Sequence, residues 1–133
     1  MKVIQAAAYA TCALLLANAT VLELKAQEST HRVYYSVPSW APDGKTIAFE
    51  SNRDGEAAVY TIRPDGSGLT RLTPKGTPGE QPNWSADGRK IVFTSVHERA
   101  RQLNLMNPDG SGVVPLPGTD NGFLASFSPD GRL

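Results

Sequence analysis

Two short stretches hold residue types that could bind a metal ion or a nucleotide. Residues 52–56 (Asn-Arg-Asp-Gly-Glu) place side-chain oxygens at a spacing that calcium loops use. The set is far short of an EF-hand loop and Arg53 adds a positive charge, so we interpret the segment as a structural turn. Residues 39–46 end in Gly-Lys-Thr, as a phosphate-binding loop does, but Ser39 stands where that pattern has its first glycine. We therefore predict neither a metal site nor a cofactor.

The candidate catalytic residues are equally few. His31 and His97 are the only histidines, and neither belongs to a two-histidine metal pattern. No Gly-x-Ser-x-Gly nucleophile elbow occurs in the 133 residues. The aspartates of the Pro-Asp-Gly runs recur in one sequence context, which is typical of hairpin turns rather than of catalytic carboxylates. We predict that the chain has no catalytic residues and is not an enzyme.

The elements that position these residues follow from an internal repeat. Residues 38–45 (Pro-Ser-Trp-Ala-Pro-Asp-Gly-Lys) return as 82–89, and residues 64–68 (Pro-Asp-Gly-Ser-Gly) return unchanged as 108–112, both with an offset of 44 residues. A period of about 40 to 45 residues fits the four-stranded blade of a β-propeller. The predicted fold is all-β, with four-stranded antiparallel blades in an incomplete ring.

The repeat also predicts the organisation of the chain. The predicted parts are a signal peptide and flank (1–27), a lead-in (28–37), two blades (38–81 and 82–125) and the start of a truncated third blade (126–133). The predicted strands are 36–41, 45–51, 58–63 and 69–73 in the first repeat, and 80–85, 89–95, 102–107 and 113–117 in the second. Both Trp40 and Trp84 are expected in the core. We interpret the chain as a fragment of a longer propeller, because a blade needs a neighbour on each face.

The N-terminal segment predicts export. Lys2 is followed by an apolar run over residues 6–17 and a small-x-small motif at 17–19, which is the layout of a secretory signal peptide. A membrane anchor is the rival interpretation, but the run is shorter than the roughly 20 residues of a spanning helix. Cleavage after Ala26 or Gln27 is a further option. We expect a periplasmic or secreted protein, with no membrane span after cleavage and without Cys12, its only cysteine.

The net charge of the chain bears on whether its partner could be a nucleic acid. Lysine and arginine number 13, as do aspartate and glutamate, so the net charge is zero. A chain without a general positive field does not attract nucleic acid electrostatically. We expect no nucleic-acid partner.

The repeat resembles the WD-like propeller repeat of TolB-type proteins. The resemblance rests on residues 40–45 (Trp-Ala-Pro-Asp-Gly-Lys), 47–55, 60–62, 64–68 and 69–73, and it covers residues 38–131. The second copy departs from it at Ala86 and at residues 96–99. The resemblance implies a propeller in an exported setting. It does not carry over the partnership of TolB with the Tol-Pal system, because the α/β domain that precedes the TolB propeller has no counterpart here.

Three functions are compatible with these features. We favour an exported scaffold that binds a protein or peptide. The alternative is the N-terminal propeller of a prolyl-oligopeptidase-type serine hydrolase whose catalytic domain is not in this chain, and the third is a purely structural repeat.

Blade topology places loops 52–57 and 96–101 on one rim, together with connections 74–81 and 118–125. This rim differs most between the two copies, and recognition is commonly carried by loops. The candidate partner-binding residues are Arg53, Glu80, His97, Arg99 and Arg101.

Overall fold

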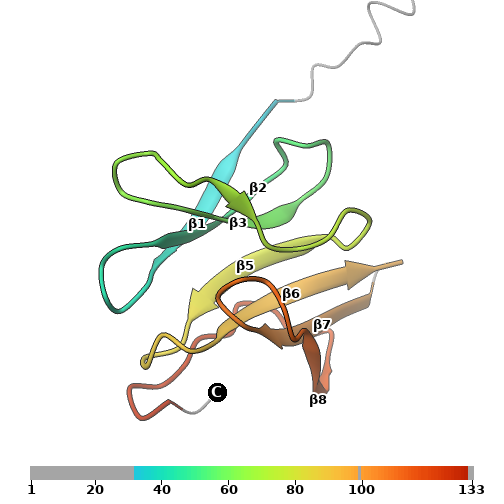
Figure 1. Ribbon diagram of the computed structural model, residues 1–133. Helices are drawn as coiled ribbons and strands as arrows, with labels where there is room; N and C mark the ends of the chain where they lie inside the picture. The colour runs from blue at the N-terminus through green and yellow to red at the C-terminus, as the bar shows by residue number, and fades with distance from the viewer. Residues whose placement is uncertain (1–31, 99, 132–133) are drawn as a thin grey trace, which may run out of the picture. The chain divides into compact units, whose positions relative to one another are not determined.

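A computed structural model describes residues 32–98 and 100–131 (Figure 1). The chain divides into two compact units, Met1–Arg32 and Val33–Leu133, and every assigned strand lies in the second. The predicted signal peptide falls outside the described residues. Across those residues there is no helix of the length and apolar character needed to cross a membrane.

The second unit contains two four-stranded antiparallel sheets. The strands are β1 (Tyr35–Trp40), β2 (Ile47–Ser51), β3 (Ala58–Ile62), β4 (Thr70–Arg71), β5 (Gly79–Trp84), β6 (Ile91–His97), β7 (Ala100–Met106) and β8 (Val114–Asp120). Their order is β1-β2-β3-β4 in one sheet, the first blade, and β5-β6-β7-β8 in the other, the second blade. This confirms the all-β prediction of four strands in each repeat. The two blades do not close a ring (Figure 1).

Each blade is shaped by two turns in which an aspartate caps its own loop. The backbone N–H two residues further along donates to the aspartate Oδ1 in all four turns. The donors and distances are Lys45 to Asp43 at 2.9 Å, Ser67 to Asp65 at 2.9 Å, Arg89 to Asp87 at 3.0 Å and Ser111 to Asp109 at 2.9 Å. The structural role predicted for these aspartates is confirmed.

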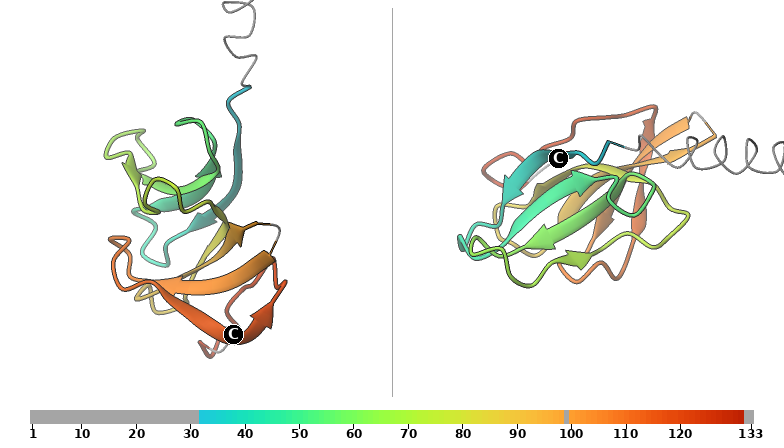
Figure 2. Two further views of the ribbon diagram at one scale, coloured as in Figure 1. Left: turned by 90° about the vertical axis from the view of Figure 1, so that its right-hand side faces the viewer. Right: turned by 90° about the horizontal axis from the view of Figure 1, so that it is seen from above.

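One of the two apolar clusters of the core lies between the blades. Val59 and Leu72 of the first blade form one apolar cluster with Ile91, Phe93 and Met106 of the second, and all five are buried. Strand β5 lies against β1, β2 and β3 of the first blade (Figure 1 and Figure 2). Burying each of the larger side chains contributes roughly 1.5 to 3 kcal/mol, so this contact is a main source of stability.

The two tryptophans differ in environment, and the core prediction is wrong for one of them. Trp84 packs against the apolar cluster between the blades, whereas Trp40 is 55% exposed. The reason is that the first blade covers Trp84, and no blade within the described residues stands in the same relation to Trp40.

The predicted loop 96–101 is also corrected. Strands β6 and β7 continue to His97 and Ala100, which pair with each other, so only two residues separate them. Val96 pairs with Arg101 in the same ladder. His97 and Arg101 therefore lie on strands, because hairpin pairing continues through residues that we expected to be irregular.

Candidate binding surfaces

The loop rim is the end of the unit that holds the β2–β3 loop, the β6–β7 turn and the chain connections after β4 and β8. The backbone N–H of Gly76, in the connection after β4, donates to Glu56 Oε1 of the β2–β3 loop at 2.8 Å. On the second blade, Asn121 N–H donates to the Arg101 carbonyl at 2.6 Å. Loops and connections thus meet at one end of each blade.

Residues 52–56, the segment with calcium-loop spacing of its oxygens, form ion pairs with an arginine. Arg71 Nη2 lies 2.5 Å from Glu56 Oε1, and Arg71 Nη1 lies 3.6 Å from Asp54 Oδ2. The Tyr60 hydroxyl donates to Asp54 Oδ2 at 2.8 Å. Arg71 therefore stands beside the two carboxylates as their counter-ion.

These contacts favour the charged carboxylates. The hydrogen bond from Tyr60 is the main cause that lowers the pKa of Asp54, and the hydrogen bond from the Gly76 N–H is the main cause that lowers the pKa of Glu56. In the described part of the chain, no three His, Cys, Asp or Glu side chains gather in a way that could hold a metal ion.

Two of the five candidate rim residues are brought together. Glu80 of β5 and Arg101 of β7 form an ion pair with a distance of 3.6 Å between Oε2 and Nη2. The Arg101 guanidinium also lies 5.8 Å from the centre of the Phe123 ring, and the residue Phe123 is 56% exposed. Charged and aromatic groups are thus presented together on the second blade. His97 is exposed at the end of β6, while Arg99 lies outside the described residues.

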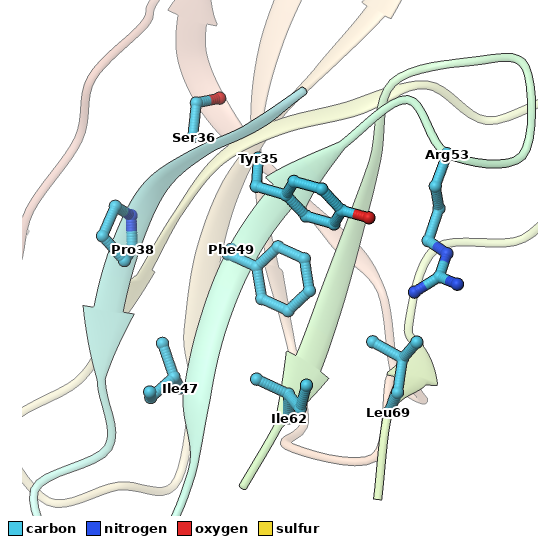
Figure 3. A pocket seen from close by; sticks show the side chains of 8 residues that line it. All are labelled: Tyr35, Ser36, Pro38, Ile47, Phe49, Arg53, Ile62 and Leu69. Atoms are coloured by element: carbon cyan, nitrogen blue, oxygen red, sulfur yellow. The ribbon is translucent and has the colours of Figure 1, made fainter. Parts of the chain in front are cut away.

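Arg53 lies in the β2–β3 loop, where it also borders an apolar groove on the first blade. The groove has a volume of about 380 Å³ and opens on the face that points away from the second blade. Figure 3 shows Tyr35 and Phe49 side by side, Ile47, Ile62 and Leu69 below them, and the Arg53 side chain extending toward Leu69. The Tyr35 and Phe49 ring centres are 6.0 Å apart. We call this surface the open face.

Sequence reasoning missed a buried carboxylate between the blades. Glu50 is 8% exposed and accepts hydrogen bonds from the Tyr34 hydroxyl at 2.8 Å and from the Gln81 N–H at 3.1 Å. Partial burial and the hydrogen bond to Glu50 raise the pKa of Tyr34, which keeps the phenol protonated as a donor. The available signal was a charged residue at a strand position that faces the neighbouring blade.

A β-bulge in the first strand of the second blade directs the Gln81 N–H toward Glu50. No feature of the sequence predicted this bulge. Gln81 and its counterpart Val37 both have positive φ, at 54° and 48°, and both lie where the pairing of the first strand shifts. This conformation is uncommon for non-glycine residues.

Comparison with known proteins identifies the family. Residues 17–133 match the family described as TolB beta propeller domain. The chain belongs to this family. A Tol-Pal system protein TolB from Syntrophus aciditrophicus (strain SB) is 46% identical over 35 residues, which are 26% of this chain and 8% of that protein.

Solved structures agree with this TolB-type propeller assignment. A protein from Agrobacterium tumefaciens assigned to TolB matches with a TM-score of 0.63 and 32% identity, over 74% of this chain and 40% of its own. TolB from Acinetobacter baumannii matches with a TM-score of 0.58 and 25% identity, over 71% of this chain and 24% of its own. The chain thus spans two fifths or less of the length of each of these relatives.

Proposed function

We propose that this TolB-family propeller is an exported scaffold that binds a protein or peptide through its loop rim and has no catalytic activity of its own. The observation that carries the proposal is the group formed by Glu80, Arg101 and Phe123, where an ion pair and an exposed aromatic ring share one surface. Arginine and aromatic residues are enriched at protein interfaces.

The scaffold around this group supports a recognition role. The turn aspartates cap their own loops, and Asp54 and Glu56 are paired with Arg71, so these carboxylates serve the fold. A rigid scaffold with variable loops at one end is a common basis for binding.

Export to the periplasm or the medium is part of the same proposal. It is supported by the signal-peptide layout of residues 1–27 and by the name of one relative, a Tol-Pal system protein.

The binding surface is tested by site-specific crosslinking in the native host. A photoreactive p-benzoylphenylalanine is placed at position 80 or 101 of the full-length protein, and at position 45 or 89 on the opposite rim as matched controls. We expect a discrete protein adduct from positions 80 and 101 alone. Adducts from only 45 and 89 would contradict the proposal.

Calorimetry with the partner identified by crosslinking then measures how much each charged residue contributes to the binding affinity. Arg101→Glu and Glu80→Lys should each weaken binding by roughly 1 to 2 kcal/mol, as interface residues near the contact centre do. Lys45→Glu and Arg89→Glu should leave the affinity unchanged.

A further inference from the structure

The turn that follows β8 contains an Asn-Gly pair at residues 121 and 122. The backbone of Asn121 is left-handed, with φ of 63°, and asparagine is one of the few non-glycine residues that adopt this conformation readily. At Gly122 an added Cβ would lie 2.9 Å from the Thr119 carbonyl oxygen and 3.2 Å from Leu103 Cγ, so this position leaves no room for a side chain. The geometry of the turn therefore favours an asparagine directly before a glycine.

An asparagine that precedes glycine can lose its side-chain amide without an enzyme. The glycine nitrogen, after losing its proton, attacks the asparagine Cγ. The new C–N bond closes a succinimide ring, and the bond from Cγ to Nδ2 breaks to release ammonia. Water then opens the ring at one of its two carbonyls, which gives either aspartate or isoaspartate, whose main chain runs through Cγ. Glycine hinders the attack least because it has no Cβ.

The side chain of Asn121 is free to reach the attacking nitrogen. It is exposed, and within residues 32–98 and 100–131 its amide has no hydrogen-bond partner. The turn aspartates show the contrast, since each holds its Oδ1 on the backbone N–H two residues further along, as Asp109 does with Ser111 at 2.9 Å.

The other asparagines of the described residues lack these features. Asn52 and Asn104 are buried and hydrogen-bonded. Asn107 is followed by a proline, whose nitrogen has no proton to lose, and Asn83 is followed by a tryptophan, which is far bulkier than glycine. In this part of the chain, Asn121 alone combines an exposed amide with a following glycine.

The preceding connection shows that a following blade leaves this position accessible. Gly79 is the counterpart of Gly122, since at both glycines an added Cβ would lie 3.2 Å from a side chain of the third strand of the blade. Pro78, the residue before Gly79, is partly exposed although the complete second blade follows it. We therefore expect Asn121 to stay accessible when a blade follows it.

One hydrogen bond opposes the reaction. The Gly122 N–H donates to the Thr119 carbonyl at 2.8 Å, and it must leave that acceptor before its nitrogen can attack. Exposed turns open locally at a much lower free energy than the unfolding of a whole sheet. The folded protein can therefore reach the reactive geometry.

We propose that Asn121 deamidates spontaneously in the folded protein and yields aspartate and isoaspartate at the loop rim. The Asn121 N–H donates to the carbonyl of Arg101, so the new carboxylate arises beside the strand that carries the Glu80–Arg101 ion pair. Isoaspartate also lengthens the main chain of this turn by a methylene group.

The test is peptide mapping by mass spectrometry of the full-length protein after incubation in mildly alkaline buffer. We expect Asn121 to lose its amide, with the aspartate and isoaspartate peptides separated by chromatography, while Asn52, Asn83, Asn104 and Asn107 retain theirs. Asn121→Gly, which suits the left-handed backbone, is the matched control and should yield no deamidated peptide from this turn. Circular dichroism verifies that both proteins stay folded during the incubation.

A parallel incubation in urea gives the rate for the unfolded chain. Retention of the Asn121 amide in buffer would overturn the proposal, and its loss in urea alone would assign the protection to the folded turn. Earlier loss at another asparagine would overturn it as well. The measurement needs no binding partner, so this proposal and the loop-rim function can fail separately.

Discussion

Single residues decide which carboxylates of this fold are stabilised in their charged form. Arg71 serves Asp54 and Glu56 in the first blade, and the corresponding position of the second blade is Pro115. The two blades share a backbone design, but only the first has this cation at its loop. The first blade therefore has a charge contact at its β2–β3 loop, from Arg71 to two carboxylates, that the second blade lacks at the corresponding position.

The loss of thermal stability at acid pH should show the contribution of Glu56 in the first blade. The pKa of Glu56 is lowered from its ordinary value of 4.5, so its stabilising effect is complete above that pH and is lost as the pH falls through the lower folded-state value. Glu56→Gln removes this titration. We expect the melting temperature of the variant to fall less between pH 5 and pH 3 than that of the wild type.

Glu98→Gln is the matched control for that measurement, since Glu98 is an exposed glutamate in the β6–β7 turn. Equal falls in melting temperature for wild type and Glu56→Gln would show that the contacts of Glu56 with the Gly76 N–H and with Arg71 do not stabilise the loop.

At the scale of elements, identical turns have different neighbours. Gly66 and Gly110 occupy the same Pro-Asp-Gly-Ser-Gly turn with φ of 85° and 84°. An added Cβ at Gly66 meets nothing within 4 Å, whereas at Gly110 it would lie 2.6 Å from the Leu72 carbonyl oxygen. The second turn therefore touches the backbone of the preceding blade.

This pair separates backbone strain from blade packing. Gly66→Ala should cost about 1 to 2 kcal/mol, the strain of a left-handed conformation. Gly110→Ala should cost a further 1 to 3 kcal/mol, because the clash with Leu72 adds overpacking. Urea unfolding of both variants measures the difference, and equal losses would contradict the blade contact.

A second packing prediction concerns Gly79, the first residue of β5. Gly79→Ala should destabilise the protein by about 1 to 3 kcal/mol through the clash with Thr73 Cγ2. Thr73→Ser removes that methyl group and keeps the hydroxyl that accepts from Val59 N–H at 3.2 Å. The double variant should regain most of the loss, and additive losses in the thermodynamic cycle would show that the two residues are not in contact.

The sequence predicted the strands well because turn residues mark where each one ends. It failed where the outcome depends on a neighbour: Trp40 and Trp84 occupy corresponding positions of the repeat, but only Trp84 is covered. The sequence likewise did not predict the left-handed backbone conformation of Gln81 in the bulge, since glutamine carries no preference for that conformation. Among the candidate site residues, charge and position predicted a shared rim, but not that Glu80 would pair with Arg101 or that Arg53 would border the open face.

For the whole molecule, export is the property that a direct experiment decides. Residues 1–30 fused to a reporter that is active only outside the cytoplasm should yield activity, because the segment has the charge and apolar run of a signal peptide. Mass spectrometry should place the new N-terminus between Thr20 and Glu28. An exported reporter that retains Met1 would mean that the segment is an anchor.

The contacts of the inner strands have a consequence for the order of assembly. Gln81 N–H at the start of β5 donates to Glu50 of the first blade, and Leu124 N–H, in the connection from β8 toward the third repeat, donates to Gln81 Oε1 at 3.0 Å. Each new repeat thus finds acceptors on a unit that was synthesised before it. As the chain leaves the ribosome, a finished blade can serve as the template for the next strand, so the propeller can grow in the direction of translation without waiting for its last residue.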